Sequence, residues 1–207
     1  VTDGDRVYGF GREPQYYRWT TPIEHHLFAT TVGQPITRQD MAPAAGAVIR
    51  VDKSPSLHCG QTPLTMEARI KPSSGNGVIL ARGGMHHGCA LLLHKGRPRF
   101  CIRVKSRLSE VSAKQRLAPG KWVHITGVLT ADKQLEIYID GRRAASNPAQ
   151  DFIQGDPAEP LQVGADEETT VAPSAMSVPF EGRIDEVRFY GRGVGASEVA
   201  KRAAAEP

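Results

Sequence analysis

The chain has 207 residues, of which 40% are hydrophobic and 6% aromatic, and its formal net charge is +4. This length suffices for one large domain with a full core, and no run of apolar residues is long enough to span a membrane. The positive charge is dispersed and accompanies no helix-turn-helix, zinc-finger or RNA-binding signature, which argues against nucleic acid as a partner.

The first 46 residues differ in sequence pattern from the rest of the chain. The chain begins abruptly in a strand-like segment without a signal peptide, as a fragment of a longer, secreted chain would. The segment D-G-D-R-V-Y-G-F-G resembles a strand of quinoprotein-type propeller repeats, and P-I-T-R-Q-D-M-A-P-A-A-G is typical of a linker. We therefore expect residues 1–46 to be an extension or linker, which the resemblance implies is the tail of a preceding propeller, and residues 47–207 to form the main domain.

Short apolar runs separated by turn residues follow one another from residue 47 onward. In the clearest of them, Leu64, Met66, Ala68 and Ile70 share one face and polar residues occupy the other, which is typical of a half-buried antiparallel strand. The predicted strands cover residues 47–51, 64–72, 77–82, 89–93, 99–105, 122–130, 134–140, 161–166 and 182–190.

These strands predict an all-β fold. Lys95-Gly96 and Asp140-Gly141 are suited to tight hairpin turns, and no helical pattern lies between strands, which argues against a parallel βαβ sheet. Nine or more antiparallel strands imply a two-sheet sandwich or jelly roll. A short helix is expected only at the C-terminal end, in A-S-E-V-A-K-R-A-A-A.

The three cysteines are Cys59, Cys89 and Cys101, without the C-x-x-C spacing of a zinc or redox site. A two-residue turn at Lys95-Gly96 places Cys89 opposite Ile102, so that the thiols of Cys89 and Cys101 point to opposite faces. A three-residue turn would bring them together in a disulfide. We favour free, buried thiols.

Basic residues gather loosely between Lys95 and Arg107. They alternate with apolar residues, which favours the solvated face of a strand. The alternative is a patch for an anionic polysaccharide.

Asp185 and Glu186 are adjacent within the last predicted strand. Glycosidases need two carboxylates facing one cleft, whereas consecutive strand residues point to opposite faces unless a bulge intervenes. Glu136 and Asp140 share a face, but Asp140 is better explained by its turn. No nucleophile-elbow, zinc-protease or P-loop motif occurs, so we predict that the domain has no catalytic residues.

Four segments resemble the laminin G-like jelly-roll family of the concanavalin A-like lectin/glucanase superfamily. They are V-D-K-S-P-S-L-H-C-G-Q-T-P-L-T-M-E-A-R-I-K-P, G-K-W-V-H-I-T-G-V-L-T, L-E-I-Y-I-D-G-R-R-A-A and F-E-G-R-I-D-E-V-R-F-Y-G-R-G-V-G-A-S-E-V. The physical interpretation of these segments agrees with the resemblance: we expect Trp122 to pack in the core beside Val123 or Ile125. We also expect Phe180, Ile184 and Val187 to seal the sandwich where the last strand returns beside the first. Arg69 stands where many relatives carry Trp.

The same resemblance implies a structural Ca²⁺ at the sandwich edge, because relatives often bind one through oxygen ligands. Asp185 near the last strand and Asp52 near the first are the candidate ligands, with Asp166, Glu167 and Glu168 as a second acidic loop. For each of these acids a solvated or hydrogen-bonded role is the alternative. His86-His87 is expected in a loop, with a metal or ligand role as its alternative.

The resemblance implies a non-catalytic recognition module for carbohydrate or a protein, attached to other domains of a longer extracellular or periplasmic chain. Its ligand-binding residues are not predicted. A glycoside hydrolase or polysaccharide lyase on the same sandwich is the first alternative, and a structural spacer is the second.

Overall fold

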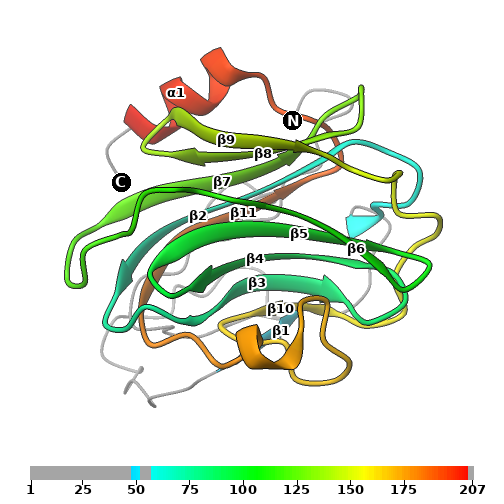
Figure 1. Ribbon diagram of the computed structural model, residues 1–207, viewed down its shortest axis with the longest axis horizontal. Coiled ribbons are helices and arrows are strands. Elements are labelled where there is room, and N and C mark those ends of the chain that lie inside the picture. Colours follow the sequence, from blue (N-terminus) through cyan, green and yellow to red (C-terminus); the bar gives the residue numbers. More distant parts are fainter. Residues whose placement is uncertain (1–47, 52–56, 205–207) are drawn as a thin grey trace, which may run out of the picture.

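The computed structural model describes residues 48–51 and 57–204 as two antiparallel sheets packed face to face (Figure 1). The six-stranded sheet has the order β1-β10-β3-β4-β5-β6, and the five-stranded sheet has the order β11-β2-β7-β8-β9. Their strands are β1 (Ile49–Val51), β2 (Leu64–Pro72), β3 (Gly77–Gly83), β4 (Gly88–His94), β5 (Arg97–Val104), β6 (Arg107–Ser112), β7 (Val123–Leu129), β8 (Gln134–Ile139), β9 (Arg142–Pro148), β10 (Leu161–Val163) and β11 (Gly182–Tyr190). This arrangement confirms the predicted all-β sandwich.

The main core lies between the two sheets and follows the predicted alternation. Leu64, Met66, Ala68 and Ile70 of β2 are fully buried and face residues such as Phe100 of β5 across the interior. The predicted sealing residues Phe180, Ile184 and Val187 are also buried in this core. Apolar faces of two half-buried sheets therefore close on each other, which is the usual basis of a β-sandwich.

Two hairpin turns have the predicted chemistry. Lys95 and Gly96 have φ of 52° and 75°, and Asp140 and Gly141 have φ of 47° and 77°. Two consecutive positive φ values are typical of type I′ turns, which match the twist of the flanking strands. Each turn therefore fixes the register of its hairpin.

The register places Cys89 and Cys101 as predicted. Cys89 pairs with Ile102 and Cys101 with Ala90, so the two thiols lie on opposite faces of the sheet. Cys59, Cys89 and Cys101 are buried free thiols. The disulfide alternative for the β4–β5 hairpin is thus wrong.

The sequence pattern misses two strands, β6 and β9. Both are edge strands, and β9 is exposed at nearly every position. An edge strand without a buried face has no need of apolar alternation, and charged residues there discourage edge-to-edge association. The pattern also overextends β10, which ends at Val163 because the chain turns away at Gly164 (φ 90°).

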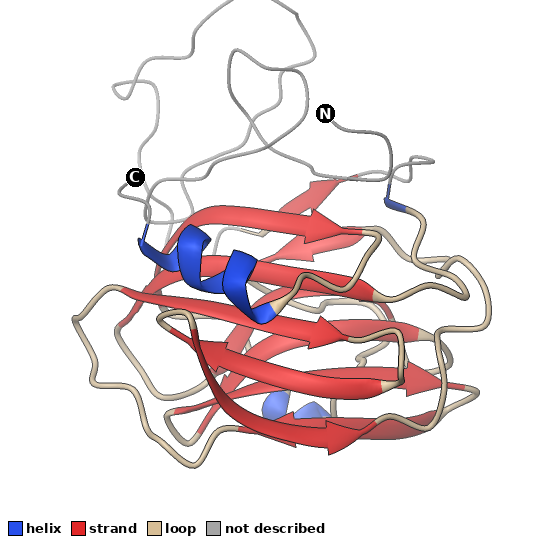
Figure 2. Cartoon of the chain, turned by 90° about the horizontal axis from the view of Figure 1, so that it is seen from above, coloured by secondary structure: helices blue, strands red, loops and turns tan. Residues whose placement is uncertain are grey.

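Each sheet is covered on part of its outer face. The segment that contains the 3₁₀ helix η2 (Ser174–Met176) packs on the six-stranded sheet, where Val171, Ala172 and Met176 contact an apolar cluster of β3, β4 and β5. Helix α1 (Ala196–Ala204) lies across the five-stranded sheet (Figure 2). Val199 is its buried anchor.

Two expectations about the fold are wrong. The last strand, β11, pairs with β2, whereas β1 pairs with β10 in the other sheet. Trp122 is 43% exposed instead of packing in the core. Side chains alternate between the two faces of a strand, so Trp122, directly before β7, lies on the same outer face as His124. Ile125 and Leu129 lie on the other face and point to the interior.

The predicted extension 1–46 lies outside the described residues. Among the helices within 48–51 and 57–204, none is long and apolar enough to cross a membrane.

Candidate functional site

The adjacent acids of β11 sit on a β-bulge. The β11–β2 register shifts between Asp185 and Arg188, and Glu186 has φ of 50°. Asp185 Oδ1 accepts a hydrogen bond from the Glu186 N–H (2.8 Å), which stabilises this conformation. Strict strand alternation, on which the sequence argument relied, is therefore wrong at this point. The bulge sends the Glu186 carboxylate to Arg69 and Arg188, each 3.2 Å away.

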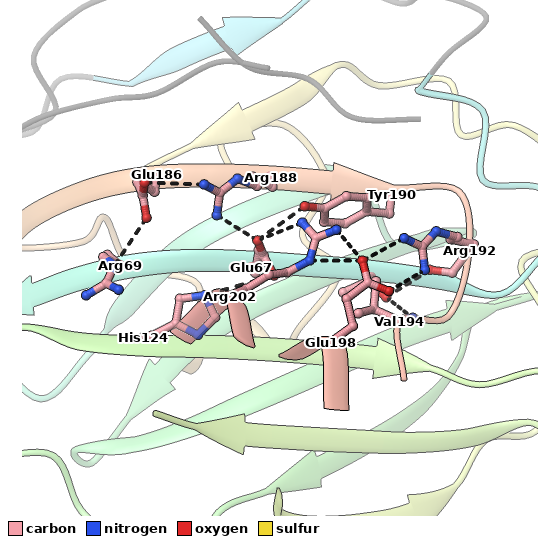
Figure 3. A network of polar contacts seen from close by, with 11 residues as sticks. Glu67, Arg69, His124, Glu186, Arg188, Tyr190, Arg192, Val194, Glu198 and Arg202 are labelled. Atoms are coloured by element: carbon pink, nitrogen blue, oxygen red, sulfur yellow. Dashed lines mark hydrogen bonds and ion pairs between the residues drawn. The ribbon is translucent and has the colours of Figure 1, made fainter. Parts of the chain in front are cut away.

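Glu67 is the centre of a polar network on the outer face of the five-stranded sheet (Figure 3). It is fully buried, and its Oε1 accepts hydrogen bonds from Arg188 (2.9 Å) and Tyr190 Oη (3.3 Å). Arg202 of α1 lies 3.6 Å from the same oxygen. Burial raises the pKa of Glu67, and the guanidiniums of Arg188 and Arg202 oppose that rise.

The network attaches α1 to the sheet. Arg192 donates to Glu198 at 2.9 and 2.8 Å, and Arg202 Nε donates to it at 3.1 Å (Figure 3). Arg69 donates to the Ala203 carbonyl (2.9 Å). A cation bound to a carbonyl of the last turn also complements the helix dipole. The helix thus covers the buried Glu67, and Glu198 on the helix shares Arg202 with it.

His124 of β7 lies within the same network. Its side chain is 1% exposed, and its Nε2 is 3.9 Å from Glu67 Oε2. Burial, and after it the charges of Arg69 and Arg188, lower the pKa of His124 to about 4. The imidazole is therefore neutral at neutral pH, and its contact with Glu67 is not an ion pair there.

Replacing His124 with leucine should remove part of the acid sensitivity of the fold. The folded-state pKa of about 4 lies below the ordinary value of 6.5, so the unfolded chain takes up the proton first. The stability due to this group is complete above its unfolded pKa and is lost as the pH falls towards the folded pKa. Between pH 7 and pH 5 this loss amounts to about 2 kcal/mol.

Urea unfolding of the wild type and of His124→Leu at both pH values measures this loss. The quantity to compare is the change in unfolding free energy between the two pH values in each protein. Any packing difference cancels in this comparison, and so does the opposite pH dependence due to the raised pKa of Glu67, which both proteins share. Identical pH dependence in the two proteins would contradict the assignment.

The candidate calcium ligands are not brought together within the described residues. Asp185 is 8% exposed and uses Oδ1 to hold the bulge, whereas Asp52 lies outside the part of the chain that the structure describes. Within that part no group of three or more His, Cys, Asp or Glu side chains is arranged to hold a metal. Ca²⁺ takes six to eight oxygen ligands, so Asp185 by itself is not a fit, and calcium remains a prediction.

The second acidic loop is engaged in contacts within the protein. Glu167 and Glu168 lie 3.0 and 2.8 Å from the guanidinium of Arg50. Asp166 is 5% exposed and accepts the Val171 N–H (2.8 Å), and burial raises its pKa to about 7. These are the hydrogen-bonded roles that stood as the alternative to metal binding.

The histidine pair lies in the β3–β4 loop, as predicted. His86 Nδ1 is 3.0 Å from Ser106 Oγ, and His87 Nδ1 accepts the Lys105 N–H at 3.4 Å. The pair thus ties its loop to the β5–β6 turn. This contact between two loop tips explains the pair without a metal.

The loose basic cluster also makes structural contacts. Arg99 pairs with Glu110 (3.0 Å), and Arg103 donates to the carbonyls of Val171 (2.6 Å) and Ser106 (2.9 Å). Two of its strand cations therefore hold neighbouring segments, which weakens the cluster as a polysaccharide patch.

The remaining acids with a common face, Glu136 and Asp140, have partners as well. Glu136 accepts from Tyr138 Oη (2.6 Å) and lies 2.5 Å from Arg143 Nη1. Asp140 occupies the β8–β9 turn and accepts the His124 N–H (2.9 Å). The role of Asp140 in the turn was correctly predicted.

Trp122 is the feature that sequence reasoning misplaced. It is one of three exposed large hydrophobic residues in the described chain, with Met85 and Val178, and its parity places it on the outer face of the five-stranded sheet. Lys71 of β2 and Arg183 of β11 are direct partners on that face. The polar residues that share the parity of Trp122, His124 and Thr126, were the signal in the sequence that it points outward.

Comparison with known proteins identifies a family for most of the chain. A family model described as the concanavalin A-like lectin/glucanases superfamily matches residues 45–200. No curated protein matches the sequence.

Several solved structures share the sandwich at low sequence identity. The CBM40 domain of a Ruminococcus gnavus IT-sialidase, bound to α2,3-sialyllactose, has a TM-score of 0.58 and 11% identity, covering 78% of this chain and all of that one (100%). Domain 4 of the extracellular GH43 arabinanase AbnA from Geobacillus stearothermophilus, in complex with arabinotriose, has a TM-score of 0.56 and 17% identity, covering 70% and 68%. A heptameric SAP-like pentraxin from Limulus polyphemus has a TM-score of 0.56 and 15% identity, covering 71% and 72%. At these identities the likeness concerns the fold.

Proposed function

The chain belongs to the concanavalin A-like lectin/glucanases superfamily, and on that premise we propose that it is a non-catalytic carbohydrate-binding module. The neighbours of its fold include carbohydrate-binding domains, two of them solved with oligosaccharides. The module belongs to a longer extracellular or periplasmic protein in this proposal, and it directs that protein to a glycan.

The exposure of Trp122 is the observation that carries the proposal. An indole left 43% exposed on a sheet face keeps apolar surface in water that a ligand can cover with a gain in free energy. The apolar C–H face of a sugar ring can pack on an indole, while the indole N–H remains available to a hydroxyl. Tryptophan is also enriched among the residues that dominate binding energies.

The buried acids of the network around Glu67 support a non-catalytic role. Glycoside hydrolysis needs an accessible pair of carboxylates flanking the scissile bond. Glu67 and Glu186, which share Arg188, are buried at 0% and 7% exposure beneath or beside α1. Desolvated and paired carboxylates of this kind hold the fold instead of reaching a polymer.

Titration calorimetry with a panel of neutral and acidic oligosaccharides tests the proposal. We expect dissociation constants in the micromolar to millimolar range for at least one glycan, and a loss of about tenfold or more for Trp122→Ala. Met85→Ala is the matched control. Met85 is also an exposed large hydrophobic residue (58%), but it lies in the loop between β3 and β4 and not on the sheet face, so its replacement should leave binding unchanged.

Three outcomes would change the proposal. If no glycan of the panel binds, the structural spacer is favoured. If Trp122→Ala and Met85→Ala lose the same affinity, Trp122 is not part of the binding site. Release of reducing or unsaturated ends during the titration would favour the hydrolase or lyase alternative. Repeating the titration with EDTA tests the proposed calcium, since a structural Ca²⁺ would make binding sensitive to chelation.

A further inference from the structure

We infer that the glycan is anionic and lies on a row formed by Arg183, Lys71 and Trp122; this inference rests on the carbohydrate-binding function proposed above. Arg183 and Lys71 are direct cross-strand partners on β11 and β2. On the other side of β2, Ile70 pairs with Val123, so Trp122 is the residue that continues the row beside Lys71. Three adjacent segments thus present two cations and an indole on one face.

The two cations of this row lack acidic partners. Neither Lys71 nor Arg183 forms an ion pair with any residue in 48–51 or 57–204. Glu181 and Asp185 each lie two positions from Arg183, and neither forms an ion pair with the two cations: Glu181 contacts Ser73 through its backbone carbonyl, and Asp185 Oδ1 accepts the Glu186 N–H. Within the described residues, neither cation of the row is therefore neutralised by an ion pair.

The rest of the same face shows the opposite pattern. Arg69, Arg188, Arg192 and Arg202 are each bonded to a carboxylate beneath or on α1. Cations that serve the fold are thus neutralised, whereas the two beyond the helix are not. Unpaired cations beside an aromatic ring complement a ligand that carries both an apolar face and a negative charge.

The dimensions of the row suit a short oligosaccharide. Neighbouring strands are about 4.8 Å apart, so the row from β11 to the start of β7 spans roughly 10 Å. One sugar ring can pack on Trp122 while a carboxylate or sulfate on the next ring meets Lys71 and Arg183. Arginine favours such planar oxyanions because its guanidinium can donate two parallel hydrogen bonds.

Calorimetry with tetragalacturonate, its neutral methyl ester and a sulfated disaccharide tests the charge requirement. The double variant Lys71→Gln/Arg183→Gln should bind at least one of the two anionic sugars tenfold or more weakly than the wild type, and raising the salt from 0.05 to 0.5 M should weaken the wild type similarly. Whichever anion responds identifies carboxylate or sulfate as the recognised group. The control Arg107→Gln/Lys114→Gln removes two exposed cations elsewhere and should bind as the wild type does.

The outcomes separate this inference from the function on which it rests. If the methyl ester binds as tightly as the acid and only Trp122→Ala weakens it, the anionic inference fails while the carbohydrate-binding function stands. Equal losses in the two double variants would also overturn the inference, because the effect would then be one of net charge. If no glycan of any charge binds, both fail. Unchanged thermal midpoints verify that all variants are folded.

Discussion

Replacing Glu67 with alanine should lower the free energy of unfolding by about 3–5 kcal/mol. The carboxylate is fully buried between Arg188 at 2.9 Å and Arg202 at 3.6 Å. Its removal takes from Arg188 and Arg202 their shared buried carboxylate and leaves each with one other acidic partner, Glu186 and Glu198 respectively. Removing one member of a buried ion pair is far costlier than the net contribution of the pair, because the remaining charge stays desolvated. Urea unfolding at pH 7 gives the difference.

Glu110→Ala is the matched control for this prediction. Glu110 lies at a similar distance from its partner, 3.0 Å from Arg99, but its side chain is 37% exposed. Solvent screening limits an exposed pair to about 0–1 kcal/mol. Equal destabilisation by the two alanine variants would contradict the claim that burial makes Glu67 critical.

Hydrogen exchange locates the effect of Glu67→Ala within the fold. Arg202 connects Glu67 to α1, so the amides of α1 should exchange faster in the variant than those of the β4–β5 hairpin, which is distant from the network. Uniform acceleration over both regions would indicate a global effect without a specific role in helix docking.

The fold was predictable because its central strands have a buried face. The alternation of apolar residues predicts β2, through Leu64, Met66, Ala68 and Ile70. The turn type of Lys95-Gly96 fixes the register of β4 and β5. The edge strands β6 and β9 were missed for the complementary reason: exposed residues obey no such pattern. Hydrophobic periodicity reports burial, and it is silent where a strand has none.

The candidate site was less predictable because its features are non-local. Glu67 has the parity of a solvent-facing residue, yet it is buried because a helix from more than 120 positions later in the chain covers it. The bulge at Glu186 likewise depends on pairing with β2 and leaves no local signature beyond the adjacent acids. By contrast, the outward direction of Trp122 was predictable from the alternation of β7, because His124 and Thr126 occupy the same face. The core position was predicted from the large apolar side chain alone, and the alternation was the better guide.

Replacing Gly127 with alanine should destabilise the protein by about 3 kcal/mol through a clash between the two sheets. A Cβ at Gly127 of β7 would lie 2.5 Å from two ring carbons of Phe100 on the opposing sheet, and Phe100 is fully buried. The ring cannot move into solvent, so the sheets must separate or the ring must leave its rotamer, and both cost packing energy. This cost exceeds the benefit of about 0.5–1 kcal/mol that a strand gains when glycine becomes alanine.

Gly155→Ala makes the same substitution where no atom lies within 4 Å of the new Cβ, and it should change the unfolding free energy by less than about 0.5 kcal/mol. A double-mutant cycle with Phe100→Leu tests the cause. The smaller side chain should recover part of the loss at Gly127, with a coupling free energy of about 1–3 kcal/mol, whereas it should not couple to Gly155. Additive losses for Gly127→Ala and Phe100→Leu would contradict the clash. Since Phe100 fills the space left by the missing side chain, this glycine determines how closely the two sheets approach at that point.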